Sequence, residues 1–89
     1  MIDCSHANSN KQHQKQIDVA HDISQQISAG NRNIVGVMVE SHLVAGRQDI
    51  IPGQTLTYGQ SITDACISWD DSLPVLRELA SAVSTRRNT

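Results

Sequence analysis

The sequence is short of the large side chains that usually build a core. Its 89 residues include no phenylalanine, one tryptophan and one tyrosine. Aromatic rings bury a large surface each, and a chain of this length buries only a modest share of its total surface. We therefore expect one small domain at most, with a weak core of its own.

Long apolar runs, a signal-like start and basic clusters are also missing. No run approaches the roughly 20 apolar residues that cross a bilayer, and the first residues lack the charged start and long apolar segment of a secretory signal. The formal net charge is -2, and Arg86 and Arg87 form the single basic pair. We expect a cytoplasmic protein with no membrane and no nucleic acid among its partners.

Cysteine is scarce as well. Cys4 and Cys66 stand far apart in the sequence, which suits neither a disulfide framework nor a zinc ribbon. We expect two reduced thiols, with Cys4 serving as a small packing residue.

The first part of the chain predicts a strand followed by a helix. Residues 1–5 change from apolar to polar, which is typical of the end of a strand. A helix is predicted over 9–29, with a cap among Asn8 to Asn10 and a stop at Gly30. Its apolar residues recur at helical spacing: Ile17, Ala20, Ile23 and Ile27.

A second strand and a long connection follow. Residues 34–40 form an apolar, mostly β-branched run that ends at Glu40, which is typical of a strand buried on both faces of a parallel sheet. Glycine and proline are frequent over 41–60. A long loop is predicted there, or a hairpin between Ile50 and Tyr58.

A second helix is predicted over 71–86. Asp71 and Ser72 are its expected caps, and Pro74 is expected in the first turn, where proline is tolerated. Trp69 is interpreted as a packing anchor for this helix. The expected buried stripe consists of Leu73, Leu76, Leu79, Ala80 and Val83.

This order of elements predicts an α/β fold. Two consecutive strand-then-helix units imply parallel strands with right-handed crossovers. A two-stranded parallel sheet leaves both edges and much of its surface uncovered. The pattern therefore indicates part of a larger structure, and we expect self-association or strand exchange to give a homo-oligomer.

Three polar residues stand at or near the ends of apolar runs: His6, Glu40 and Asp64. Ligands of α/β proteins bind at the carboxyl ends of the strands. One imidazole and two carboxylates suit a divalent cation such as Mn, Fe, Co or Zn, with positions left for water or substrate. The trio is a candidate metal site.

Ordinary alternatives stay open from the residues alone. His6 could be a loop histidine, Glu40 a solvated strand end and Asp64 a helix cap or Asx turn. A small unrelated metal-binding α/β module is a further alternative. The remaining histidines are interpreted as exposed: His13, His21 and His42.

Four segments of the sequence closely resemble one enzyme family. They are residues 1–9 (MIDCSHANS), 36–43 (GVMVESHL), 58–66 (YGQSITDAC) and 68–70 (SWD). These segments are similar to the C-terminal part of type I 3-deoxy-D-arabino-heptulosonate 7-phosphate (DAHP) synthase, also called phospho-2-dehydro-3-deoxyheptonate aldolase. The resemblance runs in one register over essentially the whole chain.

The resemblance implies an enzyme of the TIM-barrel, or (β/α)8, class. The family condenses phosphoenolpyruvate with erythrose 4-phosphate, the first step of the shikimate pathway to the aromatic amino acids. This chain would supply the last two β/α units of the barrel.

The resemblance also implies a divalent metal held by a cysteine, a histidine, a glutamate and an aspartate. The last three fall on His6, Glu40 and Asp64. The metal orients and polarises the aldehyde of erythrose 4-phosphate. His6 and Asp64 are the expected catalytic and substrate-binding residues, with His6 toward phosphoenolpyruvate and Asp64 toward erythrose 4-phosphate.

The chain departs from the family by what it does not contain. The family's cysteine ligand, the Lys-Pro-Arg-Thr segment beside it and the phosphate-binding arginines and lysines lie upstream, and neither Cys4 nor Cys66 matches that cysteine. We expect a fragment that is inactive alone. The alternative is a non-catalytic remnant that serves as a structural or association module. Residues 1–89 specify neither the identity of the metal ion nor whether Phe, Tyr or Trp inhibits the enzyme.

Overall fold

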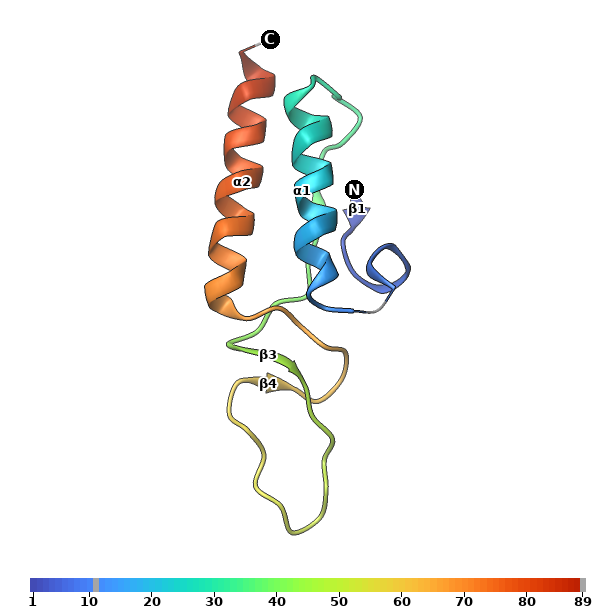
Figure 1. Ribbon diagram of the computed structural model, residues 1–89, viewed down its shortest axis with the longest axis vertical. Helices are drawn as coiled ribbons and strands as arrows, with labels where there is room; N and C mark the ends of the chain where they lie inside the picture. The colour runs from blue at the N-terminus through green and yellow to red at the C-terminus, as the bar shows by residue number, and fades with distance from the viewer. Residues whose placement is uncertain (11, 89) are drawn as a thin grey trace.

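The computed structural model describes residues 1–10 and 12–88 of the chain (Figure 1). Two helices lie beside very short strands, and a long loop extends from one end, so the molecule measures 57 × 23 × 16 Å. The elements in chain order are β1 (Ile2–Asp3), a 3-10 helix η1 (His6–Ser9), α1 (Lys15–Ser28), β2 (Val37–Met38), β3 (Val44–Arg47), β4 (Gln60–Ser61) and α2 (Trp69–Arg87).

The first two strands pair in parallel, as the sequence predicts. Ile2 lies opposite Val37 and Asp3 opposite Met38. Both strands are shorter than the expected ranges 1–5 and 34–40, because each has a single partner and backbone pairing ends where that partner diverges. The carboxyl ends of β1 and β2 therefore reach the same edge, close to the residues of the candidate site.

The first helix is also shorter than expected. The range 9–29 is occupied at its start by the end of η1 and a turn, and α1 begins at Lys15; position 11 lies outside the described residues. Asn10 adopts a left-handed conformation with φ 53°, which asparagine tolerates, so it ends η1 instead of capping α1. Gly30, with φ 103°, follows the end of α1 as predicted.

The second helix starts two residues before the predicted range. The Ser68 hydroxyl accepts a hydrogen bond from the Asp71 N–H at 3.1 Å and caps the helix, whereas the predicted caps Asp71 and Ser72 lie within its first turn. Pro74 consequently lies in the second turn, where it offers no N–H to the carbonyl of Asp70.

The predicted buried stripe of α2 is wrong in part. Small side chains, Ser72 and Ala82, are buried against the rest of the protein together with Val75. Ala82 lies against α1, where a small side chain allows close approach of the two helices, and Ser72 bonds to Ser41 and Ser68. Of the predicted stripe, Leu79 and Val83 pack against the core, whereas Leu76 is 55% exposed; Trp69 is half exposed instead of being a buried anchor.

The predicted hairpin in the long loop is also wrong. No strand lies between Ile50 and Tyr58, and β3 and β4, which flank the loop, pair in parallel with a register shift. The side-chain amide of Gln48 closes the base of the loop, because it donates to the Thr57 carbonyl at 2.7 Å and accepts from the Thr57 N–H at 2.8 Å. These bonds take the place of a hairpin ladder.

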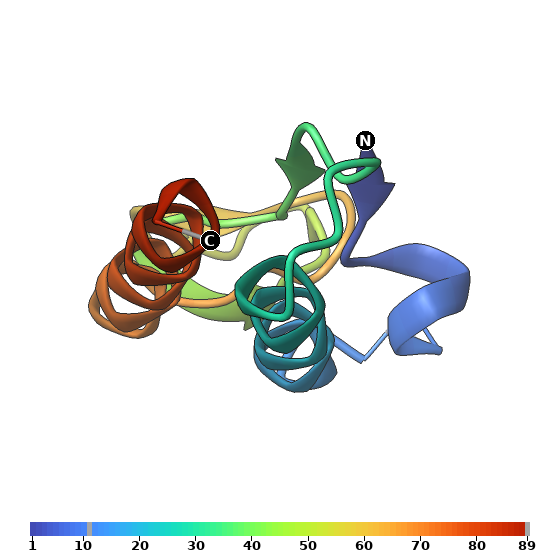
Figure 2. The same ribbon diagram turned by 90° about the horizontal axis from the view of Figure 1, so that it is seen from above.

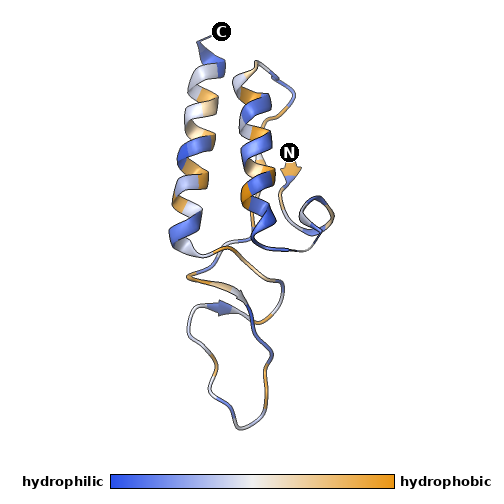
Figure 3. Ribbon diagram, in the orientation of Figure 1, coloured by the Kyte–Doolittle hydropathy of each residue, from blue (hydrophilic) through white to orange (hydrophobic). Residues whose placement is uncertain are grey.

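The core lies between the helices and the short strands. In Figures 1 and 2, α1 lies between α2 and the N-terminal segment. Apolar and polar residues interrupt one another along both helices (Figure 3), and neither helix of the described part is long and apolar enough to cross a membrane. The buried cluster contains no aromatic ring and consists of Cys4, Ala20, Ile23, Ile27, Ile34, Ile67, Val75 and Ala82.

Candidate metal centre

The three residues of the predicted site lie together in the structure. His6 opens η1 just after β1, Glu40 follows β2 by two residues, and Asp64 lies in the loop after β4. His6 Nε2 is 3.2 Å from Glu40 Oε1 and 3.2 Å from Asp64 Oδ2. One ligand atom from each residue lies within 4.8 Å of the others. The parallel pairing of β1 and β2 accounts for the meeting of His6 and Glu40.

The ring of His6 is fixed by residues of its own segment. Its Nδ1 lies 3.0 Å from Asp3 Oδ2 and 2.8 Å from Ser5 Oγ. The Ser5 hydroxyl donates to Asp3 Oδ1 at 2.9 Å, so both neighbours of Nδ1 are acceptors and Nδ1 carries a proton. A carboxylate that holds one ring nitrogen in this way directs the other nitrogen toward a ligand site.

The same contacts change the acidity of both groups. The hydrogen bond with Asp3, followed by the one with Asp64, raises the pKa of His6. The hydrogen bond with His6, followed by the one from the Ser5 N–H, lowers the pKa of Asp3. His6 also has a positive φ of 51°, which is uncommon for a residue with a Cβ. Asp3 therefore supports the site, and its spacing of three residues before His6 is the signal that could have identified it.

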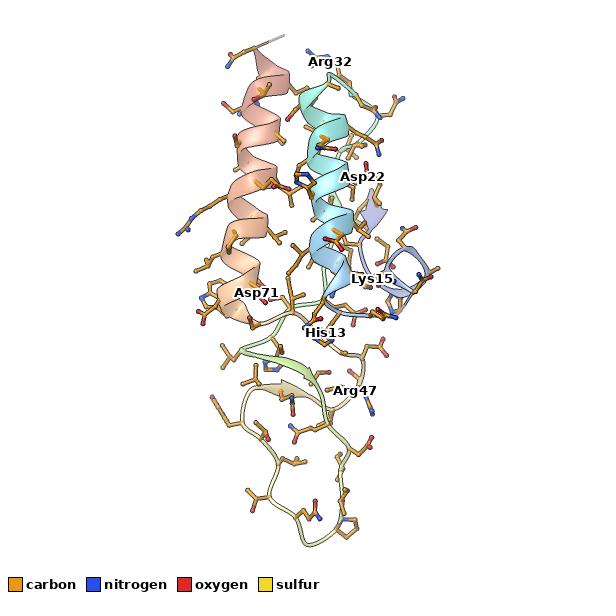
Figure 4. All side chains as sticks on the ribbon, viewed as in Figure 1. His13, Lys15, Asp22, Arg32, Arg47 and Asp71 are labelled. Carbon is orange, nitrogen blue, oxygen red and sulfur yellow. The ribbon has the colours of Figure 1, made fainter. Side chains whose placement is uncertain are left out.

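Asp64 is positioned through its chain neighbours. Arg47, labelled in Figure 4 at the base of the long loop, donates from Nε to the Thr63 carbonyl at 2.7 Å and from Nη2 to Asp49 at 2.7 Å. The Ser61 hydroxyl accepts from the Thr63 N–H at 3.1 Å. Asp64 itself keeps 67% of its side chain exposed, so it can reach a ligand from solvent.

A small polar cavity lies behind the trio. Its volume is about 20 Å³, and His13 lines it together with His6 and Glu40. Figure 4 shows His13 just before α1. The sequence predicts an exposed His13, whereas in the structure this side chain is only partly exposed and lines the cavity. His21 and His42 are exposed as predicted.

The two cysteines are buried and unpaired, as predicted. Burial raises the pKa of the Cys4 thiol; burial, together with the negative charge of Glu40, raises that of Cys66. Neither thiol belongs to the group of donors that the described residues bring within ligating range. A buried thiol with a raised pKa is a poor metal ligand, because metals bind the thiolate.

The donor set fits a divalent first-row metal ion. Ligand atoms about 2.1 Å from a metal lie about 3.0 Å apart at right angles and about 3.4 Å apart in a tetrahedron. The two contacts of His6 Nε2, both 3.2 Å, fall within that range. Imidazole and carboxylate donors suit Mn, Fe, Co and Zn alike.

The chain is similar to proteins of one family over almost its whole length. Residues 1–77 match the model of the DAHP synthetase I family. A phospho-2-dehydro-3-deoxyheptonate aldolase of Haemophilus influenzae is 60% identical over 87 residues, covering 98% of this chain and 24% of the relative. A tyrosine-inhibited aldolase of the same name from Schizosaccharomyces pombe is 56% identical, with 98% and 24% covered.

A solved structure gives the same result. The phospho-2-dehydro-3-deoxyheptonate aldolase of Francisella tularensis is 52% identical and superposes with a TM-score of 0.88, covering 96% of this chain and 25% of that one. The chain thus spans about a quarter of the length of these relatives. Because the family match covers most of its residues, the chain belongs to the DAHP synthetase I family.

Proposed function

We propose that the chain is the part of a DAHP synthase that supplies the last two β/α units of a (β/α)8 barrel. The whole enzyme would condense phosphoenolpyruvate with erythrose 4-phosphate in the cytoplasm, as the first step of the shikimate pathway. The observation that carries the proposal is the meeting of His6, Glu40 and Asp64 at the carboxyl edge of a parallel strand pair. Barrel enzymes build their active sites at that edge.

In this proposal the trio holds a divalent metal ion, Mn, Fe, Co or Zn, with a further ligand from another part of the enzyme. The ion would supply Lewis-acid polarisation of the aldehyde of erythrose 4-phosphate. Asp3 keeps the His6 ring turned so that Nε2 faces the two carboxylates. His6 would also contact phosphoenolpyruvate, and the exposed Asp64 would accept a hydrogen bond from a hydroxyl of erythrose 4-phosphate.

We further propose that the chain alone is inactive. Both substrates carry phosphate, which proteins bind through several fixed cationic donors. The candidate centre presents three carboxylates, Asp3, Glu40 and Asp64, to such anions. Arg47, the arginine bonded beside Asp64, is engaged by Thr63 and Asp49.

A second candidate function is that of a non-catalytic association module, and one observation favours it. Trp69 and Leu76 are about half exposed beside an apolar groove of about 290 Å³, whose walls include Val37, Val39 and Leu79. Exposed apolar area of this kind marks surfaces that bind other chains. We propose that the isolated chain covers the groove by forming a homo-oligomer.

A chimeric enzyme would test the catalytic proposal. In the Haemophilus influenzae relative, the matched quarter is replaced by residues 1–89, and formation of DAHP from the two substrates is measured. We expect activity near that of the parent, a loss of at least about 100-fold with Glu40→Gln, and little change with the control Glu78→Gln, a carboxylate of α2 that contacts His21 of α1 and not the trio. A folded chimera without activity, or an active Glu40→Gln chimera, would contradict the proposal.

A further inference from the structure

Gln16, near the start of α1, is among the most deeply buried side chains of the protein, with 1% exposure. A primary amide is costly to bury unless its donors and acceptor are bonded. Its Nε2 donates to the Glu40 carbonyl at 3.0 Å, and its Oε1 accepts from the Glu40 N–H at 2.8 Å. Both bonds of this amide therefore go to the backbone of one residue, a member of the candidate trio.

The two bonds reproduce the pairing that a neighbouring strand would make. A side-chain amide carries the same donor and acceptor as a peptide group, and a paired residue in a sheet exchanges both bonds with one partner. Glu40 lies beyond the end of β2, where pairing with β1 has stopped. Gln16 continues the pairing there, and the Ile67 N–H adds a bond to the Glu40 carbonyl at 3.0 Å.

The position of the Glu40 carboxylate depends on that backbone. Its Oε1 lies 3.2 Å from His6 Nε2, and the side chain is only 17% exposed, so it has little room to adjust if the backbone moves. Gln16 also lines the small cavity behind Glu40 and His6. A shift of the Glu40 backbone would thus carry the carboxylate away from the other two ligands.

We propose that Gln16 is a positioning residue of the metal centre, which fixes the Glu40 backbone so that its carboxylate stays within ligating distance of His6. The inference rests on the proposed function, in which the trio binds a divalent ion. If Gln16 had a purely structural role, its two bonds would only hold α1 against the strands. Loss of those bonds would then change the stability of the chain and leave the metal affinity of folded molecules unaltered.

Three variants of the 89-residue chain separate these roles. Gln16→Met keeps the length of the side chain and removes both bonds. Gln16→Glu keeps an acceptor for the Glu40 N–H and loses the donor to its carbonyl, and it serves if the methionine variant fails to fold. Gln26→Met is the matched control, because Gln26 is an exposed residue of the same helix whose side-chain amide bonds to Asp22 at 3.4 Å.

Amide hydrogen exchange measured by NMR is the first measurement. We expect the Glu40 N–H to exchange at least about tenfold faster in Gln16→Met, while the amides of Ile23 and Ile27 keep their protection and report an intact α1. Gln26→Met should leave the Glu40 amide unchanged. Equal exchange at Glu40 in the variant and the unaltered chain would overturn the inference.

The second measurement is the Mn²⁺ affinity, determined by electron paramagnetic resonance well below the unfolding temperature. Loss of a residue that orients a metal ligand typically weakens binding by about 10- to 100-fold. We expect that loss in Gln16→Met, a smaller one in Gln16→Glu and none in Gln26→Met. If the Mn²⁺ affinity falls with Glu40→Gln but not with Gln16→Met, the positioning role of Gln16 is overturned and the proposed metal site stands. Affinity that is unchanged by Glu40→Gln would refute the proposed metal site, and this inference with it.

Discussion

Ile67 has the largest fully buried side chain of the described residues. It is 1% exposed and belongs to the same buried cluster as Cys4 and Val75. Its backbone also joins the site, because its N–H donates to the Glu40 carbonyl and its own carbonyl accepts from the His42 N–H, both at 3.0 Å. Substitution by alanine removes side-chain packing and keeps both of these bonds.

The expected cost of Ile67→Ala follows from the three carbon atoms removed. At about 0.8 kcal/mol for each buried carbon the transfer contribution is about 2.4 kcal/mol. The cavity left behind adds to it, and measured losses for such substitutions are about 2–5 kcal/mol. We expect a loss of about 3 kcal/mol in the free energy of unfolding. A chain of this length holds about 4–13 kcal/mol in all, so the variant should be close to unfolding.

Urea unfolding followed by far-ultraviolet circular dichroism measures this loss. Trp69 is half exposed, so its fluorescence is a poor reporter of the core. The matched control is Ile50→Ala in the long loop, where the side chain is 65% exposed, and we expect it to change stability by less than about 0.5 kcal/mol. Each curve is recorded at two protein concentrations, because association would make the midpoint depend on concentration.

One result would refute the reasoning. If Ile67→Ala lost less than about 1 kcal/mol at an unchanged slope with urea, Ile67 would not be packed in a core in solution. A loss equal to that of Ile50→Ala would lead to the same conclusion.

Three further predictions concern the helix pair, the thiols and the groove. His21 Nδ1 of α1 lies 3.1 Å from the Glu78 carboxylate of α2, but both side chains are about half exposed. A double-mutant cycle with alanine should therefore give a coupling energy of about 0.2–1 kcal/mol. A larger value would show that the pair is shielded from solvent. Burial raises the pKa of Cys4 and Cys66, so alkylation by iodoacetamide at neutral pH should be much slower in the folded chain than in urea. Because the folded pKa values are raised, the stabilisation is complete below the ordinary thiol pKa of about 8.5 and is lost as pH rises through the folded values, so the urea midpoint should fall in alkaline buffer. Leu76→Glu should leave the helix content unchanged and weaken self-association in sedimentation velocity by at least about tenfold; an unchanged monomer fraction would exclude the groove as the contact.

The meeting of His6 and Glu40 could be predicted from the sequence. Two apolar runs that each precede a helix imply parallel strands, and the residues after such strands share an edge. Asp64 was different, because it lies in an irregular loop whose path depends on the bonds of Arg47 and Ser61. Its position near an apolar run made it only a candidate, and the resemblance to the family is what implies that it is a ligand, since loop geometry of this kind leaves no periodic pattern.

The errors in α2 have one physical source. The leucine spacing shows which residues are apolar, but the face that packs is decided by the partner. Here Ala82 lies against α1, Ser72 bonds to Ser41 and Ser68, and Leu76 lines the groove. Part of the apolar face of α2 is therefore exposed in the described residues, as expected of a chain that spans a quarter of its relatives.

Gln16 could not have been predicted from its surroundings in the sequence. A glutamine in the first turn of a helix usually faces water, and its partner Glu40 is 24 positions away. Gln48 makes the same kind of two-sided bond to Thr57 at the base of the long loop. In both places a side-chain amide bonds backbone groups that lie outside the named strands, because the strands of this chain are very short. The Glu40 backbone is therefore held by the Gln16 side chain together with the Ile67 N–H, and a single substitution at Gln16 should disturb the site more than its distance from the ligand atoms suggests.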